Sequence, residues 1–196
     1  YDAAHLTADE IAQWCADVGG PDSIAWLREG LAKSVTDPRR AVLPEFSEFE
    51  SVVVQDSYER PEHCHKLIVG DLGYVDMTVV GFGFLDFERS TLVVEDEIAP
   101  RRPTSDVVHG LSAAKAHALW GEEAPLVRKL DGPLFTIADI ANLERAELAA
   151  DAEQIDRWQA VHNAELGQAV NALRVRIKRG KIVVLRRCTT IVAHAR

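Results

Sequence analysis

Residues 66–97 read KLIVGDLGYVDMTVVGFGFLDFERSTLVVEDE and contain three apolar runs separated by gaps of turn length. The runs cover residues 66–73, 77–87 and 91–97. They are rich in β-branched and aromatic residues, which is typical of strands, and gaps this short join neighbouring antiparallel strands. We therefore expect a three-stranded meander whose first strand ends at Asp71.

After the meander, the pattern alternates between helix and strand. Apolar residues recur near the helical period over residues 107–119 and again over residues 166–177, and a glycine follows each stretch as a stop signal. Short apolar runs predict further strands over residues 125–131, 134–140 and 181–185. The expected fold class is α/β: a mixed sheet, with the antiparallel meander followed by parallel strands, flanked by helices.

The first 63 residues are expected to form a helical arm. Thr7 and Glu10 have the spacing of a capping box at the start of a first short helix, and a second short helix follows it. The remainder of the arm reads as a connecting segment. We therefore predict an arm over residues 1–63 and an α/β domain over residues 64–196.

Composition narrows the class of protein. The chain has 196 residues, of which 47% are hydrophobic and 27% charged, so it is long and apolar enough to bury a core. It has no apolar run of about 18 residues, and a membrane partner is not expected. Its three cysteines are far apart and lack CxxC spacing, which disfavours a disulfide framework or a structural zinc site and favours a reduced, intracellular setting.

The net charge of -9 conceals an uneven distribution along the chain. Residues 166–196 contain eight basic and no acidic side chains, whereas all 31 acidic side chains lie earlier. A basic strip of this kind suits contact with backbone phosphates, although a solvated surface is the alternative. The predicted DNA contacts are Arg174, Arg176, Lys178, Arg179, Lys181, Arg186 and Arg187.

Asp71 and Asp131 each stand at the end of an expected strand. If these strands pair side by side in parallel, both carboxylates emerge at the same sheet edge. Two adjacent carboxylates repel each other, and divalent cations between them offset that cost. Such ions, about 3.5–4 Å apart, activate a water and stabilise the leaving oxygen of a phosphodiester. A role in turn formation is the alternative for either residue taken singly.

The acidic residues of the third run, Glu95, Asp96 and Glu97, lie on the neighbouring strand of the meander. Strand alternation predicts that Glu95 and Glu97 point to one face of the sheet and Asp96 to the other. One of them could assist a metal ion, and an exposed strand end is the alternative.

The order of these elements resembles that of the ribonuclease H-like nucleases: an aspartate-ended strand, a meander, a helix and a second aspartate-ended strand. Three stretches are similar, more specifically, to the C-terminal nuclease domain of the large terminase subunits of tailed phages. They are WLREGLAKSVTDPRRAVLPEF (26–46), GDLGYVDMTVVGFGFLD (70–86), and VRKLDGPLF (127–135) with the later AVNALRVRIKRGKIVVL (169–185).

This resemblance implies a catalytic site. Asp71 would be the first metal ligand and Asp131 the second, together holding two Mg²⁺ or Mn²⁺ ions, with Asp76 as a further ligand or else a turn residue that caps the hairpin. The family takes another carboxylate from a helix near the C-terminus. That ligand would be Glu165 or a residue beyond Arg196.

The resemblance also implies an activity and partners. The expected activity is that of an endonuclease that cuts concatemeric viral DNA during genome packaging, in the cytoplasm of the infected bacterial host. The partners would be double-stranded DNA, the terminase small subunit and the portal. Since no P-loop motif occurs, the ATPase is expected in a preceding domain. The alternatives are another ribonuclease H-like phosphodiesterase, of the resolvase or transposase type, and a non-catalytic module that binds DNA or the portal.

Overall fold

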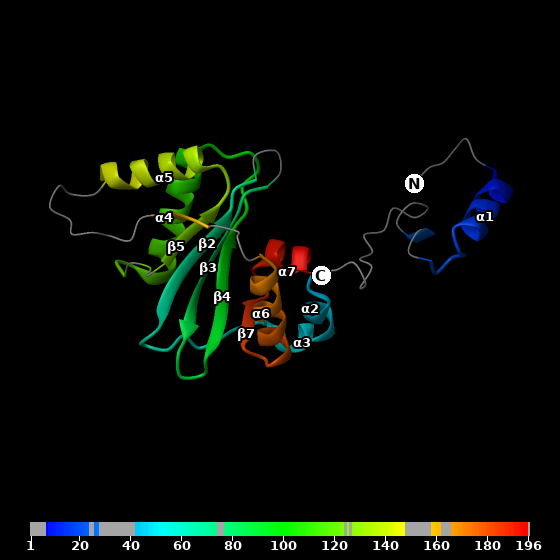
Figure 1. The fold of residues 1–196 in the computed structure, drawn as a ribbon, viewed down its shortest axis with the longest axis horizontal. Helices are drawn as coiled ribbons and strands as arrows, with labels where there is room; N and C mark the ends of the chain where they lie inside the picture. The colour runs from blue at the N-terminus through cyan, green and yellow to red at the C-terminus, as the bar shows by residue number, and fades with distance from the viewer. Residues whose placement is uncertain are drawn as a thin grey trace. The chain divides into compact units, whose positions relative to one another are not determined.

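The computed structural model describes residues 7–23, 26–27, 42–73, 77–123, 125, 127–147, 158–161 and 166–195 (Figure 1). The chain divides into two compact units, Tyr1–Pro44 and Glu45–Ala195. The division therefore falls before the expected boundary between residues 63 and 64. The reason is that part of the predicted arm, Glu45–Gln55, folds with the sheet.

The described part of the first unit contains one α-helix, α1 (Ala8–Asp17). The predicted capping box is confirmed: the Glu10 amide donates to the Thr7 hydroxyl at 3.3 Å, and the Thr7 amide donates to the Glu10 carboxylate at 2.8 Å. Trp14 packs edge-to-face on Trp26, with 5.3 Å between ring centroids. Most of the predicted second helix lies outside the described residues.

The second unit contains a seven-stranded sheet in the order β1-β7-β4-β3-β2-β5-β6. Strands β2, β3 and β4 pair antiparallel, and all the other pairings are parallel, so β3 alone among these strands runs against the rest. This confirms the predicted meander followed by parallel strands. The bounds are β1 (Val54–Gln55), β2 (His65–Asp71), β3 (Val79–Asp86), β4 (Thr91–Ile98), β5 (Val127–Asp131), β6 (Gln159–Ala160) and β7 (Ile182–Leu185).

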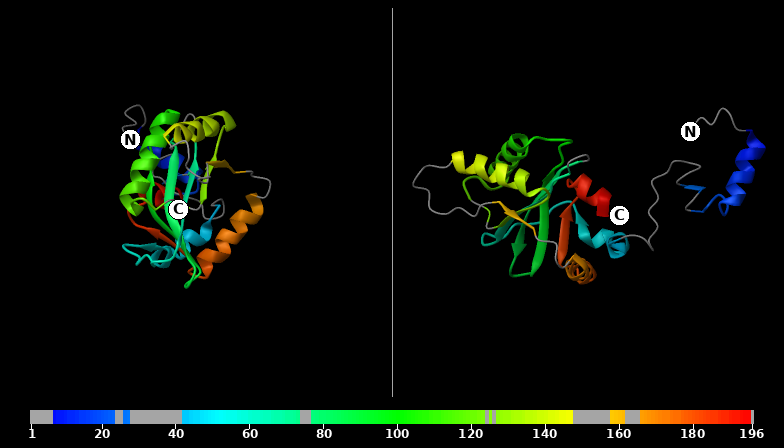
Figure 2. Two further views of the ribbon diagram at one scale, coloured as in Figure 1. Left: turned by 90° about the vertical axis from the view of Figure 1, so that its left-hand side faces the viewer. Right: turned by 45° about the horizontal axis from the view of Figure 1, so that its top comes forward.

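Helices flank this sheet. In Figures 1 and 2, α4 and α5 lie together beside β2 and β5, and α6 lies near β7. The helices of this unit are α2 (Pro44–Glu48), α3 (Glu50–Val53), α4 (Ser105–Trp120), α5 (Leu134–Glu147), α6 (Leu166–Lys178) and α7 (Thr189–Ala195). No helix among the described residues is long and apolar enough to cross a membrane.

The main core lies between the sheet and the pair α4 and α5. Phe82 of β3 and Leu130 of β5 are fully buried there against Trp120 of α4 and Ile140 of α5. Burial of large apolar side chains from four elements that are distant in sequence is the main favourable term in folding. It also fixes β2 and β5 against each other, and these are the strands that carry the two predicted ligands.

The predicted strand over residues 134–140 is wrong, because this segment forms the first half of α5. Ile137, Ile140 and Glu144 are the buried residues, and their spacing of three and four is helical. Leu134 and Phe135 are exposed and lengthen the apolar run without contributing to the core. The run therefore looks like a strand in the sequence although its buried positions follow the helical period.

Asp86, the last residue of β3, carries a fully buried carboxylate in the β3–β4 hairpin. Because this carboxylate is charged in the folded protein, we expect acid to destabilise the fold. Asp86 accepts hydrogen bonds from the Arg89 amide (3.0 Å), the Tyr58 hydroxyl (2.7 Å) and the Arg89 guanidinium (2.9 Å). These hydrogen bonds lower the pKa of Asp86 to about 2, and the bond from the Arg89 amide has the largest effect. In the same way, the Arg174 guanidinium lowers the pKa of Glu45 to about 2.

Both folded-state pKa values lie below the unfolded value of about 4. The stabilisation is therefore complete above about pH 4 and is lost as the pH falls toward 2. We expect the free energy of unfolding, measured with urea, to fall as the pH is lowered from about 4 to 2. Asp86→Asn should make that fall smaller, and an unchanged slope in this variant would contradict the assignment.

Candidate metal site and its surroundings

Asp71 and Asp131 are the last residues of β2 and β5, and they are direct partners in the parallel ladder between these strands. Neighbouring strands lie about 4.8 Å apart, and side chains of paired residues point to the same side of the sheet. The Leu72 amide donates to the Asp131 carbonyl at 2.8 Å, which continues the pairing one residue further. The predicted convergence of the two strand ends is therefore confirmed.

A glycine turn directly after Asp131 keeps these strand ends close. Gly132 has φ +146°, and a Cβ atom added there would lie 2.7 Å from the Leu72 Cβ atom. Real Cβ atoms do not approach this closely, so only glycine permits the turn. The chain can thus leave β5 tightly packed on the end of β2 without pushing the two aspartates apart.

The chemistry of this pair suits a hard cation. Two carboxylates supply oxygen ligands, which Mg²⁺ and Mn²⁺ prefer over nitrogen and sulfur. Asp71 is exposed and Asp131 is half-buried, so both can be reached from solvent. Within the described ranges, no group of three or more His, Cys, Asp or Glu residues could hold a metal. Asp76 and Glu165, the other candidate ligands, lie outside the described residues.

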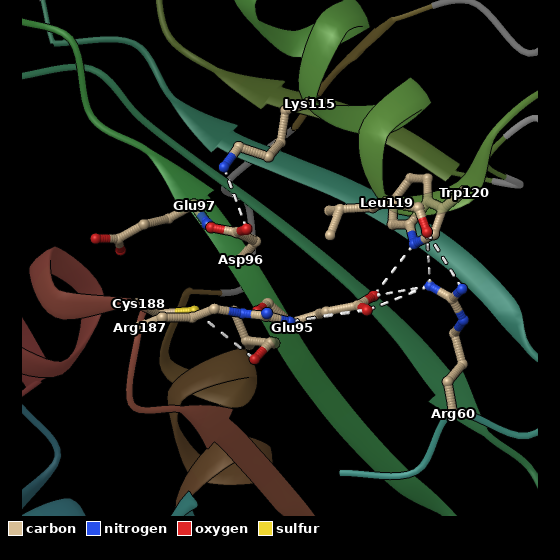
Figure 3. A network of polar contacts seen from close by, with 10 residues as sticks. Arg60, Glu95, Asp96, Glu97, Lys115, Leu119, Trp120, Arg187 and Cys188 are labelled. Atoms are coloured by element: carbon tan, nitrogen blue, oxygen red, sulfur yellow. Dashed lines mark hydrogen bonds and ion pairs between the residues drawn. The ribbon is translucent and has the colours of Figure 1, made fainter. Parts of the chain in front are cut away.

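The acidic residues at the end of β4 do not follow the predicted alternation. Phe82 pairs with Asp96, and the next residue of β3, Gly83, pairs with Val94, so Glu95 is an extra residue in the strand. Such a β-bulge resets the alternation of side chains along a strand. Glu95 and Asp96 both reach residues of α4 (Figure 3). Glu97 reaches the start of α7 instead.

Glu95 and its neighbours hold the surrounding helices in place. The Arg60 guanidinium and the Trp120 indole N–H both donate to the Glu95 carboxylate at 3.2 Å (Figure 3). Lys115 lies 3.1 Å from the Asp96 carboxylate. Glu97 accepts the backbone amides of Thr190 (2.6 Å) and Ile191 (2.9 Å) at the start of α7. All three carboxylates are thus engaged in contacts that hold helices and loops against β4.

Two residues of the predicted DNA-contact strip on α6, Arg174 and Lys178, are bound within the protein. Arg174 donates to both oxygens of Glu45 at 2.8 and 2.9 Å, and Lys178 lies 3.2 Å from the same carboxylate. Glu45 is buried, so this cluster holds α6 against α2. Arg176 and Arg179 are exposed and have no such partner among the described residues.

The part of the strip that flanks β7 is also engaged. The Lys181 ammonium donates to the Arg89 carbonyl at 2.7 Å. Arg186 pairs with Asp56 at 2.6 Å, and Arg187 donates to the Glu95 carbonyl at 2.6 Å. In the strand order, β7 is separated from β2 by β4 and β3. The structure therefore does not bring these basic residues together with Asp71 and Asp131.

This mixed sheet, with its antiparallel meander, parallel flanking strands and aspartate-ended pair β2 and β5, is the predicted ribonuclease H-like fold. No protein-family model and no curated protein matches the chain. The P22 large terminase nuclease domain superposes with a TM-score of 0.51 and 15% identity, over 74% of this chain and 73% of that domain. The large terminase nuclease from thermophilic phage G20c, solved with bound zinc, gives a TM-score of 0.52 and 16% identity, over 76% and 84%.

A longer structure matches nearly the whole chain. The large terminase from another thermophilic bacteriophage superposes over 99% of this chain, with a TM-score of 0.60 and 13% identity. The chain spans only 44% of the length of that protein. The fold is therefore that of the phage large-terminase nuclease domains, as predicted.

Proposed function

We propose that this chain is the nuclease part of a large terminase, a metal-dependent endonuclease that cuts concatemeric viral DNA during genome packaging in the cytoplasm of the infected bacterial host. The observation that carries the proposal is the ladder partnership of Asp71 and Asp131 at the ends of β2 and β5. The likeness of the fold to terminase nuclease domains, one of them solved with bound zinc, supports it.

In this proposal Asp71 and Asp131 together hold two Mg²⁺ or Mn²⁺ ions. When bound, such ions lower the pKa of a water and stabilise the charge on the leaving oxygen of a phosphodiester. The protein contributes the position of its carboxylates: paired strands fix their separation, and Gly132 keeps the chain tight after Asp131. The third ligand is Asp76, Glu165 or a residue beyond Arg196.

The substrate in this proposal is double-stranded DNA, bound chiefly through its phosphates. Arg176 and Arg179 are the members of the predicted strip best placed to contact it, because their side chains are exposed and not engaged within the described protein. The other predicted contacts would have to exchange an internal partner for a phosphate. We further propose that the arm over residues 1–63 connects to an ATPase domain, and that the full-length protein binds the small subunit and the portal.

Metal removal tests the proposed activity. The chain should nick and linearise supercoiled plasmid in Mg²⁺ or Mn²⁺, lose this activity completely in excess EDTA, and recover it when Mn²⁺ is restored, because the carboxylate pair cannot replace the charge of the ions. The measurement is a time course on agarose gels. DNA binding without cleavage in either metal would favour the non-catalytic binding module, and cleavage restricted to branched DNA would favour a resolvase.

A further inference from the structure

A cleft of about 340 Å³ lies directly beyond the ends of β2 and β5. It is bounded by the chain after Asp71, the segment before α4 and the first turn of α5. Its walls combine apolar surface with a few polar groups, an arrangement typical of small-molecule sites. The lining residues that matter here are Leu72, Thr78, Arg102, Ser105, Phe135 and Thr136.

The position of this cleft is fixed by backbone pairing. The Thr78 amide donates to the Pro100 carbonyl at 3.0 Å, and Met77 bridges to Arg101. These contacts bring the segment before α4 next to the start of β3. Arg102 follows with φ +47°, a conformation that is uncommon outside glycine and often marks functional sites. Arg102 and Pro133, which stands in the turn after Asp131, both line the cleft.

The first turn of α5 contributes an exposed aromatic ring to the cleft. Phe135 is 66% exposed and its neighbour Leu134 is 67% exposed, whereas Ile137 and Ile140 of the same helix are buried. Phe135 lies four residues after Asp131 and lines the cleft. An aromatic ring and a cationic residue that line the same cleft are the combination with which proteins bind single-stranded nucleic acid, since the ring stacks on a base and the cation contacts a phosphate.

We propose that this cleft binds one unpaired nucleotide of the DNA strand, adjacent to the phosphodiester at Asp71 and Asp131, with Phe135 as the stacking surface for its base. The inference rests on the proposed function. The size favours a single nucleotide, because about 340 Å³ is at the small end of ligand sites and excludes a stacked duplex. In paired DNA the faces of the bases are covered by their neighbours, so stacking on Phe135 requires a locally opened strand.

The proposal predicts a preference for opened DNA. In Mn²⁺, the wild-type chain should cut a duplex with a short internal bubble about tenfold faster than the same duplex fully paired, the size expected for one stacked base. Phe135→Ala should lower cleavage of the bubble by about tenfold and leave cleavage of the duplex nearly unchanged, so that the preference disappears. Phe135→Trp should retain it, because the larger ring also stacks.

Phe87 offers a matched control, because it is a half-exposed aromatic residue at the β3–β4 hairpin, at the other end of β3 from the cleft. Phe87→Ala should leave the preference unchanged. Anisotropy of a fluorescent single-stranded oligonucleotide adds a readout that needs no cleavage, and Phe135→Ala should weaken its binding about tenfold. If the wild type cuts no DNA but this loss is seen, the proposed activity fails and the nucleotide site stands. Equal binding by wild type and Phe135→Ala, or equal losses in the Phe135 and Phe87 variants, would overturn the site.

Discussion

Asp71→Asn is expected to lower metal-dependent DNA cleavage by at least about a thousandfold. Asparagine has nearly the same size and shape, so β2 keeps its backbone pairing with β5. The substitution removes one negative charge from a pair that is proposed to hold two divalent ions. Metal ions contribute several kcal/mol to transition-state stabilisation, and about 4 kcal/mol corresponds to a thousandfold in rate.

Asp131→Asn should have the same effect, and the double variant should be little worse than either single one, because groups that act as a unit are not additive. Asp139→Asn is the control, since Asp139 is an exposed aspartate on the neighbouring helix α5. The measurement is the initial rate of plasmid nicking in Mn²⁺, with circular dichroism to verify folding. Cleavage retained by either single variant would remove the catalytic assignment of that residue.

Gly83→Ala should destabilise the whole second unit by about 3 kcal/mol or prevent it from folding. A Cβ atom at this position would overlap the backbone carbonyl of Val93 on the adjacent strand. Glycine in a strand often marks such a close approach of two backbones. No rotamer change can relieve a clash with backbone, so β3 and β4 must separate at the bulge, at a cost at or above the upper end of that for overpacking a core.

Gly81 provides the comparison for this prediction. It lies two residues earlier on β3, but a Cβ atom there would meet nothing closer than the Ile191 side chain at 3.4 Å, which is ordinary contact. Gly81→Ala should therefore change the free energy of unfolding by less than about 1 kcal/mol. Urea denaturation of both variants measures the difference. If Gly83→Ala and Gly81→Ala have similar free energies of unfolding, the Val93 backbone does not lie as close to Gly83 as described.

The elements that could be predicted are those that leave a local pattern in the sequence, such as an apolar run or a polar residue at the end of a strand. Strands β2, β3 and β4 appear as separate apolar runs, and Asp71 and Asp131 stand at strand ends in the sequence itself. Their pairing needed one additional step, the parallel placement of β5 beside β2. That step followed from the order of the elements, because a helix that connects two strands generally returns the chain in parallel.

The features that were not predicted depend on contacts between distant residues. The partner of Arg174 is Glu45, 129 positions away, so a count of basic residues overstated the charge available to DNA. The β-bulge at Glu95 breaks the alternation of side chains along β4. It depends on the close approach of the Val93 backbone to Gly83 on the adjacent strand. The exposure of Phe135 could not be seen either, because an apolar residue in a sequence does not reveal whether it faces the core or a cleft.

The location of Mn²⁺ in a crystal of this chain tests the account most directly. Anomalous scattering at the manganese edge should place ions between the carboxylates of Asp71 and Asp131, in contact with oxygens of both residues, and the peaks should disappear in crystals of Asp71→Asn. Manganese bound elsewhere on the protein, with the two carboxylates pointing apart and no ion shared between them, would contradict it.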